Sequence, residues 1–393
     1  MTDGPIIFLT HTAAESGAEL AFTRMVIGLH HSGSDVSVLS TQDGPILDRL
    51  RAAGVPADCV VTDFDSSRVV IGGSLLRLAA GVRSMISTGV TIGRMARSTG
   101  ANAIVAESTK ALLMGTIASR RARIPLIWHV HDRVTTEFFG GMLAIIIRTL
   151  GAVVARGYIA NSSATAETLW TLGKPLAVAY PGVELPEPSP RHQRPPANVR
   201  VCMIGRLTEW KGQDILLEAL SLSAHAPHVT FVGGTHFGEE QYARDLAATA
   251  ERLGIAERVT FTGHIDDPQR LLSDADIAVH CSRVTEPFGQ VIVEALAGGC
   301  AVIAADAGGP REIINSGTDG VLVDCTGESA GHRLSEVLDE LIGDPVLRTR
   351  LATAGVARSA DFSIERTCVE AARVLPLHAR ARQPAVSEVD SDV

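Results

Sequence analysis

The sequence predicts an α/β protein built from two doubly wound, Rossmann-like domains, each with its own parallel sheet. Three observations lead to this fold class. Short apolar runs alternate with helical patterns along most of the 393 residues, which indicates βαβ units. A proline-rich segment, PGVELPEPSPRHQRPPA (181–197), interrupts this alternation and is typical of a linker. The hydrophobic share of 46% and the charged share of 20% are those of a globular chain with large cores.

The first half is expected to contain seven strands with helices between them. Each strand is a short apolar run bounded by turn residues. The strands are predicted at 5–10, 35–40, 58–62, 102–106, 125–130, 157–161 and 176–180, and helices at 17–32, 72–98, 109–122 and 137–154.

The alternation resumes after the prolines, with strands predicted at 199–205, 229–234, 258–263, 276–282 and 301–306. We therefore expect a first domain over 1–184, a linker over 185–197 and a second domain over 198–362. A polar, flexible tail is expected at 384–393. In such folds ligands bind at the carboxyl ends of the strands, so a cleft between the two sheets is the expected site.

Composition excludes several classes of protein. The six cysteines are dispersed and form no Cys-x-x-Cys pair, which favours reduced thiols in a cytoplasmic protein over disulfides or zinc. The first residues lack the pattern of a signal peptide, and the longest aliphatic run, MLAIII (142–147), is far too short to span a membrane. A net charge of −9 and 4% aromatic residues argue against nucleic acid as a partner.

Two cations mark the first motif, IGRLTEWKGQDILLEAL (204–220). A strand is expected to end at Gly205, and Arg206 and Lys211 then precede an amphipathic helix. Cations beside the N-terminus of a helix make a site for an anion such as phosphate. Taken alone, the motif is equally consistent with a solvated loop that carries two charges.

Two carboxylates mark the second motif, EPFGQVIVEALAGG (286–299). Glu286 is expected on the loop after a strand, and Glu294 in the following helix. The amides of Phe288, Gly289 and Gln290 would face an anion at the start of that helix. Glu294 is placed to reach the vicinal hydroxyls of a ribose. In isolation, two exposed carboxylates would be an ordinary surface feature.

Together the motifs GR-L-x(3)-KG and EPFG-x(4)-E-A resemble family 4 of the retaining nucleotide-sugar glycosyltransferases, which have the two-domain GT-B fold. The resemblance is dense over 201–324 and looser before it. It implies that the first domain is the acceptor side, that the second binds the nucleotide-sugar donor, and that the helix at 363–380 packs back on the first domain. It implies no cofactor, because the nucleotide sugar is itself the donor substrate.

The resemblance also implies roles for single residues. Arg206 and Lys211 would neutralise the leaving diphosphate, Glu286 would contact the donor sugar, and Glu294 the ribose. The remaining donor-binding positions are glycines and loop residues around the phosphates and the nucleobase: Gly205, Gly233, Gly234, Gly263, His264 and Ile265.

In the first domain, Gly17 occupies a loop that lies against the donor phosphates in similar enzymes, although the usual double glycine here is Ser16-Gly17. His131 matches a histidine near the reactive carbon of the sugar, and the alternative for it is a structural role. A zinc site at His129-x-His131 lacks a third ligand in the sequence. We expect no metal and a retaining, metal-independent transfer to an acceptor hydroxyl.

Other functions are separated by specific features. A nicotinamide dehydrogenase would show Gly-x-Gly-x-x-Gly after the first strand, and a P-loop kinase its Gly-Lys-Ser/Thr loop; neither pattern is present. A sugar-nucleotide epimerase of the same fold stays open. A non-catalytic partner subunit also stays open, but it would be expected to lose Arg206, Lys211 or Glu294.

The acceptor is expected to be a saccharide, a lipid-linked compound or a small-molecule glycoside. Residues 66–98 and 138–157 combine arginines with apolar residues, and residues 1–187 carry a net charge of +1 against −10 for the rest. Such segments suit the headgroup region of an anionic membrane. They are equally typical of ordinary domain helices, so peripheral contact with the inner membrane face is one of two interpretations.

Overall fold

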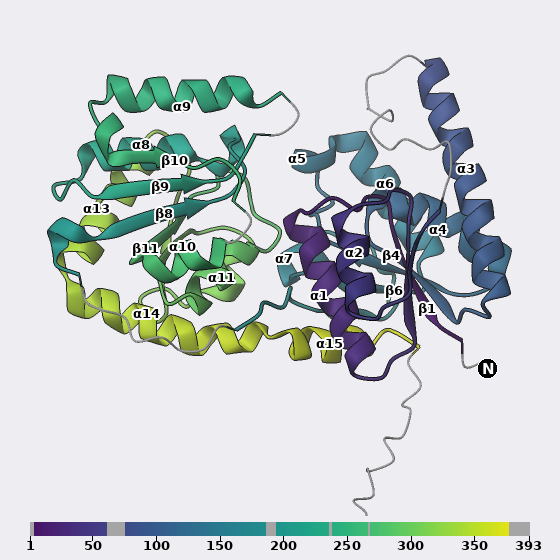
Figure 1. Cartoon of the computed structure of the whole chain (residues 1–393). Coiled ribbons are helices and arrows are strands. Elements are labelled where there is room, and N and C mark those ends of the chain that lie inside the picture. The colour runs from purple at the N-terminus through teal and green to yellow at the C-terminus, as the bar shows by residue number, and fades with distance from the viewer. Residues whose placement is uncertain (1–3, 61–74, 186–193, 236–237, 266–267, 377–393) are drawn as a thin grey trace, which may run out of the picture.

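The computed structural model describes residues 4–60, 75–185, 194–235, 238–265 and 268–376. Two α/β domains lie side by side, and the helices α14 and α15 run beneath both of them (Figure 1). Every strand pairing within the described residues is parallel. The two doubly wound domains predicted from the sequence are therefore confirmed.

The N-terminal sheet has seven strands in the order β3-β2-β1-β4-β5-β6-β7. The chain starts at the centre, winds outward to β3 and then returns to β4, so the switch of direction falls between β1 and β4. The strands are β1 (Ile6–Thr10), β2 (Val36–Ser40), β3 (Ala57–Cys59), β4 (Ala103–Ala106), β5 (Leu126–Val130), β6 (Gly157–Ala160) and β7 (Leu176–Val178). The helices are α1 (Gly17–His31), α2 (Pro45–Ala52), α3 (Leu75–Ser98), α4 (Thr109–Ala122), α5 (Thr136–Phe139), α6 (Gly141–Val154) and α7 (Ser163–Ala166).

Apolar side chains point alternately to the two faces of this sheet and so form a core on each face. On β1, Ile6 and Phe8 pack with α1, α2 and α15, whereas Ile7 and Leu9 pack with α3, α4 and α6. Successive side chains of a strand point to opposite faces, so a strand buried on both sides is apolar throughout. This is why β1 appears in the sequence as an unbroken apolar run.

The C-terminal sheet has six strands in the order β10-β9-β8-β11-β12-β13. They are β8 (Arg200–Ile204), β9 (His228–Val232), β10 (Val259–Phe261), β11 (Ile277–His280), β12 (Ala301–Ala305) and β13 (Val321–Val323). The helices are α8 (Gln213–Leu222), α9 (Glu240–Arg252), α10 (Pro268–Asp274), α11 (Gln290–Ala297), α12 (Pro310–Ile313), α13 (Ala330–Gly343), α14 (Pro345–Ser359) and α15 (Ile364–Ala372). Short 3-10 turns are η2 (Pro196–Asn198), η3 (Glu209–Lys211), η4 (Ala256–Arg258) and η5 (Ala360–Phe362).

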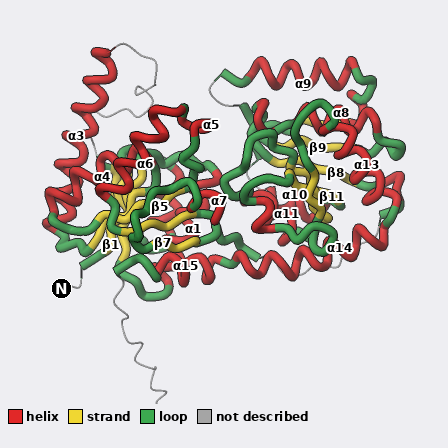
Figure 2. Tube along the Cα trace, turned by 180° about the vertical axis from the view of Figure 1, so that it is seen from behind, coloured by secondary structure: helices red, strands yellow, loops and turns green. Residues whose placement is uncertain are grey.

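The chain passes between the domains where YPGVE (180–184) meets the start of α15. Val183 donates its amide to the carbonyl of Phe362 at 3.0 Å, and a Cβ on Gly182 would lie 2.6 Å from the Cα of Ile364. Only glycine fits at this crossing. Helix α15 then packs on α1, with Cys368 and Ala371 in the N-terminal core. The view from behind shows α15 beneath the N-terminal domain, following on from α14 beneath the C-terminal domain (Figure 2).

The structure differs from the sequence prediction in three elements. The helix predicted at 137–154 is two helices, because Gly140 takes a left-handed conformation (φ 75°) between α5 and α6. Strand β13 was not predicted, and the helix expected at 363–380 ends at Ala372. Most of the linker at 185–197, the start of the segment 66–98 and the tail at 384–393 lie outside the described residues.

Candidate active site

The carboxyl ends of the two sheets face each other, and side chains cross between them. Arg24 of α1 lies 4.0 Å from Glu294 of α11, and Ser162 donates its hydroxyl to the carbonyl of Pro287. The amides of Ser163 and Ala164 donate to the Glu312 carboxylate at 2.7 Å. Parallel sheets bind ligands at this edge, so the arrangement gives both domains access to one ligand.

Lys211 and Glu286, predicted from separate motifs, meet directly. The ammonium Nζ lies 2.8 Å from Glu286 Oε2 and 4.2 Å from the centre of the Trp210 ring. Both side chains are largely buried, with 14% and 12% exposed. The pairing follows from β8 and β11 being neighbours, because η3 after one strand then adjoins the loop after the other.

Three donors surround the Glu286 carboxylate. Besides Lys211, Ser282 donates its hydroxyl to Oε2 at 3.0 Å, and Nε2 of His280 lies 3.2 Å from the same oxygen. Burial alone would raise the pKa of Glu286, but Lys211 and His280 more than offset it and hold this pKa well below its usual range. Glu286 is therefore a carboxylate at neutral pH, able to accept hydroxyl hydrogen bonds.

Arg206 lies at the same edge, but its guanidinium faces another carboxylate. Its Nε is 3.3 Å from Glu239 Oε2, and about a third of the side chain is exposed. Gln213 of α8 donates to the Arg206 carbonyl at 2.8 Å and so fixes the backbone of this turn. No hydrogen bond or ion pair among the described residues joins the Arg206 and Lys211 side chains.

Helix α11 begins beside this pair of motifs. Gly289 caps it with φ 98°, a conformation that glycine adopts without strain. The amides of Phe288, Gly289 and Gln290 donate no backbone hydrogen bond within the described part of the chain, as expected at a helix N-terminus that can receive an anion. The Phe288 ring is buried against Tyr180, so this residue can face a ligand only through its backbone.

Glu294 lies one turn further along α11. Gln290 donates its amide to Glu294 Oε1 at 2.6 Å. Burial raises the pKa of Glu294, and Gln290 and Arg24 offset only part of this effect. Glu294 is thus a buried carboxyl group whose contacts are with Gln290 and, at 4.0 Å, with Arg24 of the other domain.

The predicted glycine positions line the ends of β8 and β9. A Cβ on Gly233 would lie 2.1 Å from the carbonyl oxygen of Gly205, so the two turns pack backbone to backbone. A Cβ on Gly234 would lie 3.7 Å from His264 Cβ. His264 is exposed and Ile265 is half-buried at the end of the adjoining turn.

Gly17 and His131 lie at the matching edge of the N-terminal sheet. Gly17 begins α1, with no atom within 4 Å of the place a Cβ would take. His131 follows β5, and its carbonyl accepts a hydrogen bond from the Asn161 side chain at 2.7 Å.

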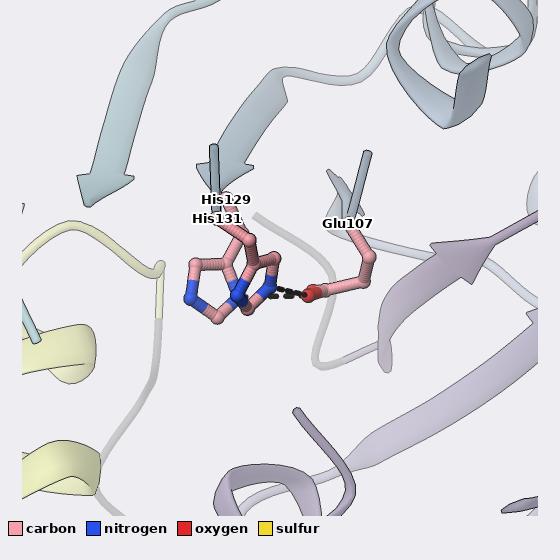
Figure 3. A group of neighbouring side chains, drawn as sticks. All are labelled: Glu107, His129 and His131. Carbon is pink, nitrogen blue, oxygen red and sulfur yellow. Dashed lines mark hydrogen bonds and ion pairs between the residues drawn. The ribbon is translucent and has the colours of Figure 1, made fainter. Parts of the chain in front are cut away.

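The His131 imidazole is held by a residue that no motif revealed. Its Nε2 lies 3.1 Å from Oε2 of Glu107, and Nδ1 of His129 lies 2.7 Å from the same oxygen. Figure 3 shows both rings aimed at this one carboxylate. Glu107 follows directly after the apolar segment NAIVA (102–106), which contains β4. A carboxyl group directly after a buried strand is the sequence feature that could have identified this residue.

These three side chains are also the types that bind metals, and their ligand atoms all lie within 4.8 Å of one another. Glu107 thus supplies the third side chain that the sequence had not shown. However, a tetrahedral zinc ion would hold its ligand atoms roughly 3.3 Å apart. The 3.1 Å contact of His131 Nε2 is instead a hydrogen bond, and the 2.7 Å separation of His129 Nδ1 from the same oxygen is shorter than the spacing of zinc ligands.

Known proteins match both domains of the chain. Residues 16–179 match the family model described as a glycosyl transferase 4-like domain, and residues 187–358 match glycosyl transferases group 1. D-inositol 3-phosphate glycosyltransferase of Thermobispora bispora is 30% identical over 295 residues, which make up 66% of this chain and 67% of the relative. The structure of Anabaena Alr3699/HepE in complex with UDP-glucose is 29% identical with a TM-score of 0.77, covering 95% of this chain and 100% of that one. The chain belongs to the GT-B glycosyltransferases.

A second curated relative matches a shorter part of this GT-B chain. The lipopolysaccharide core biosynthesis glycosyltransferase LpsE of Rhizobium meliloti is 35% identical over 161 residues, which are 41% of this chain and 44% of LpsE. The chain thus matches less than half of the length of LpsE and about two thirds of the length of the Thermobispora relative. Among the described helices of this GT-B protein, none combines the length and the apolar character needed to cross a bilayer.

Proposed function

We propose that this protein transfers a sugar from a nucleoside-diphosphate donor to an acceptor hydroxyl, with retention of the anomeric configuration and without a metal ion. The observation that carries the proposal is the Lys211–Glu286 pair beside the open amides at the start of α11. The site combines a cation, the free amides of a helix and two buried carboxylates, Glu286 and Glu294. These groups suit a diphosphate that is joined to two hydroxyl-bearing sugars.

In this reaction the bond from the anomeric carbon to the phosphate oxygen breaks, and a bond to the acceptor oxygen forms. Negative charge grows on the leaving diphosphate, where Arg206, Lys211 and the amides of α11 stabilise it. Glu286 accepts hydroxyls of the transferred sugar, and Glu294 accepts those of the ribose. Retention is consistent with attack on the face that the diphosphate leaves, with a phosphate oxygen taking the acceptor proton.

Metal independence rests on the same groups. A metal ion in phosphoryl sites neutralises the charge of the leaving group, and the proposal gives this task to Arg206, Lys211 and the N-terminus of α11. Transfer in the presence of a chelator, with the product anomer identified by proton NMR, tests both claims. Activity that needs magnesium or manganese, or an inverted product, contradicts them.

The donor is inferred to be a UDP-sugar, because HepE, which aligns over nearly the whole chain, was solved with UDP and with UDP-glucose. Titration with UDP, ADP and GDP, followed by thermal shift, gives the preferred base, since a bound nucleotide stabilises the fold by mass action. Incubation of UDP-sugars without acceptor distinguishes the alternatives. Interconversion of epimers would identify an epimerase, and nucleotide binding with no turnover of any donor would identify a non-catalytic subunit.

The acceptor side offers one apolar surface, which we infer meets an anionic phospholipid surface. Met142, Ile145, Ile146 and Val153 of α6 are all exposed, at fractions up to 78% for Met142. Arg156, just beyond this helix, is exposed as well. Apolar side chains beside arginine suit the headgroup boundary. Arg148 does not contribute as the sequence suggested, because it donates to the Val134 carbonyl and stacks on Trp170.

Vesicle co-sedimentation tests this surface. We expect binding to anionic vesicles that weakens with salt, little binding to neutral vesicles, and loss of binding in Val153→Asp. Val346→Asp is the matched control, because Val346 is equally exposed but lies on α14 of the other domain. Equal binding by both variants, together with turnover of a water-soluble acceptor, would refute the membrane inference and leave the transferase proposal standing.

A further inference from the structure

We propose that Glu107 is a positioning residue that keeps the His131 imidazole doubly protonated, so that its Nδ1–H is a fixed hydrogen-bond donor toward the bound donor substrate. The inference rests on the proposed function for the role of His131 at the sugar. The network itself stands on geometry alone. One oxygen of Glu107, Oε2, lies within 3.1 Å of a nitrogen on each of two histidine rings.

Burial makes the charge of this cluster matter. The side chains of Glu107 and His129 are 3% and 4% exposed, and that of His131 is 9% exposed. The second oxygen of Glu107, Oε1, is buried without a hydrogen-bond partner among the described residues. A buried carboxylate in this state is costly unless a cation pairs with it, and the two imidazoles are the groups in contact that can supply the charge.

Only one of the two rings can carry that charge. Their centres are 4.1 Å apart, so two imidazolium ions would repel each other strongly. Burial and the neighbouring His131 lower the pKa of His129, and Glu107 offsets only part of this. Burial would also lower the pKa of His131, but Glu107, Asp132 and Glu19 more than offset it and raise this pKa above its usual value.

The other charged groups near His131 agree with this assignment. Glu19 faces it from α1 and Asp132 from its own loop. Burial raises the pKa of Asp132, with smaller contributions from Glu19 and from Glu286 of the other domain, and His131 offsets part of this. His11, bonded to Ser108 next to Glu107, has its pKa lowered to about 4 by burial and by Lys110, so it adds no charge at neutral pH. The charges around His131 are therefore mainly negative.

The consequence is a donor with a defined direction. With Nε2 occupied by Glu107, the proton on Nδ1 is the one free to bind a ligand, and no hydrogen bond within the described residues uses it. Asn161 donates to the backbone carbonyl of His131, and the Nε2 contact with Glu107 holds the ring itself. A neutral His131 would keep its proton on Nε2, facing Glu107, and would present a bare acceptor to the substrate.

The sign of the pH effect follows. His131 is charged below its raised pKa, so the donor is present at low and neutral pH and is lost as pH rises through that pKa. In Glu107→Gln the carboxylate charge is gone and burial dominates, which lowers the pKa of His131. We expect the alkaline limb of kcat/KM to move to lower pH by about one unit or more in Glu107→Gln, and Glu107→Asp to restore part of the shift.

The test pairs kinetics with a direct view of the rings. Histidine ¹⁵N NMR of the full chain, with His131 assigned by its absence in His131→Gln, gives the protonation of both nitrogens against pH. We expect wild-type His131 charged at pH 7 and neutral in Glu107→Gln, with no change in the control Glu336→Gln, an exposed glutamate of the other domain. Activity at pH 8 should fall about tenfold more in Glu107→Gln than activity at pH 5.5.

Three results would overturn the proposal. The first is the finding that His131 of the wild-type protein is neutral at pH 7. This measurement does not depend on whether Glu107→Gln folds. Another is an unchanged His131 titration in a folded Glu107→Gln. The third is stoichiometric zinc in the purified protein that Glu107→Gln loses. If the protein neither binds UDP nor transfers sugar, the proposed function fails, but the NMR titration still decides the state of this network.

Discussion

Removing Lys211 alone should destabilise the protein more than removing both partners of the Lys211–Glu286 pair. In Lys211→Met the buried Glu286 carboxylate keeps Ser282 and His280 but loses the ammonium 2.8 Å away. An unpaired buried charge costs about 3–5 kcal/mol. Because Ser282 and His280 still contact the carboxylate, we expect a loss of roughly 2–4 kcal/mol for this variant.

The opposite variant should be milder. In Glu286→Gln the ammonium of Lys211 keeps the Trp210 ring at 4.2 Å, an interaction that contributes about 0.5–2 kcal/mol. The double variant, Lys211→Met with Glu286→Gln, buries no charge. Its loss in free energy of unfolding should therefore be smaller than the sum of the losses in the two single variants. We expect a coupling free energy of at least about 1.5 kcal/mol in this cycle, where independent sites would agree within about 0.5 kcal/mol.

Urea unfolding of the four proteins measures the cycle, with the m value checked because two domains can unfold separately. The folded pKa of Glu286 is depressed, so its stabilisation is present above the ordinary value of 4.5 and is lost as pH falls below it. The coupling should therefore shrink at acid pH. Additive single effects at pH 7 would refute the assignment of Lys211 and Glu286 as a buried ion pair.

Four further variants test the donor site and the crossing between the domains. Arg206→Ala and Glu294→Ala should each weaken UDP binding, by roughly 2–3 kcal/mol for a charge-assisted contact; unchanged calorimetric affinity in both would contradict the site. Gly289→Ala should lower UDP affinity at least about tenfold and cost about 1–3 kcal/mol of stability, because φ 98° is strained for alanine; a neutral effect on both would show that this turn adapts. Gly182→Ala should lower the melting temperature and increase proteolysis between the domains, because its Cβ would meet the Ile364 backbone at 2.6 Å; normal stability would show that the crossing is loose.

The positions of most strands along the chain and the bounds of helix α4 could be predicted because local patterns decide them. The helix predicted at 109–122 has the observed bounds, since Ser108 caps its start and accepts a hydrogen bond from the Ala111 amide. The break at Gly140 was missed because the apolar pattern continues through it, and one glycine is tolerated within many helices. Strand β13, which is three residues long, was not among the predicted strands.

The candidate site divides in the same way. Arg206, Lys211, Glu286 and Glu294 stand in spaced motifs, so the sequence pointed to them. Glu107 stands alone, and its histidine partners come more than twenty residues later. They meet only because β4 and β5 are parallel neighbours, a fact of the tertiary fold that no local pattern contains.

The ion pairs of the candidate site set a condition on how the proposed donor would bind. Arg206, Lys211 and Arg24 lie within 4.0 Å of Glu239, Glu286 and Glu294, respectively, so each cation already has a carboxylate partner. A diphosphate must compete with these carboxylates, and the sugar and ribose hydroxyls then satisfy the carboxylates that lose their cations. UDP alone brings the phosphates but no transferred sugar for Glu286. We therefore expect Glu286→Gln to bind UDP at least as tightly as the parent while its turnover of UDP-sugar falls, because a charge that repels phosphate is removed together with a sugar contact. Weaker calorimetric binding of UDP by Glu286→Gln would show instead that Glu286 mainly holds Lys211 in place for the phosphates.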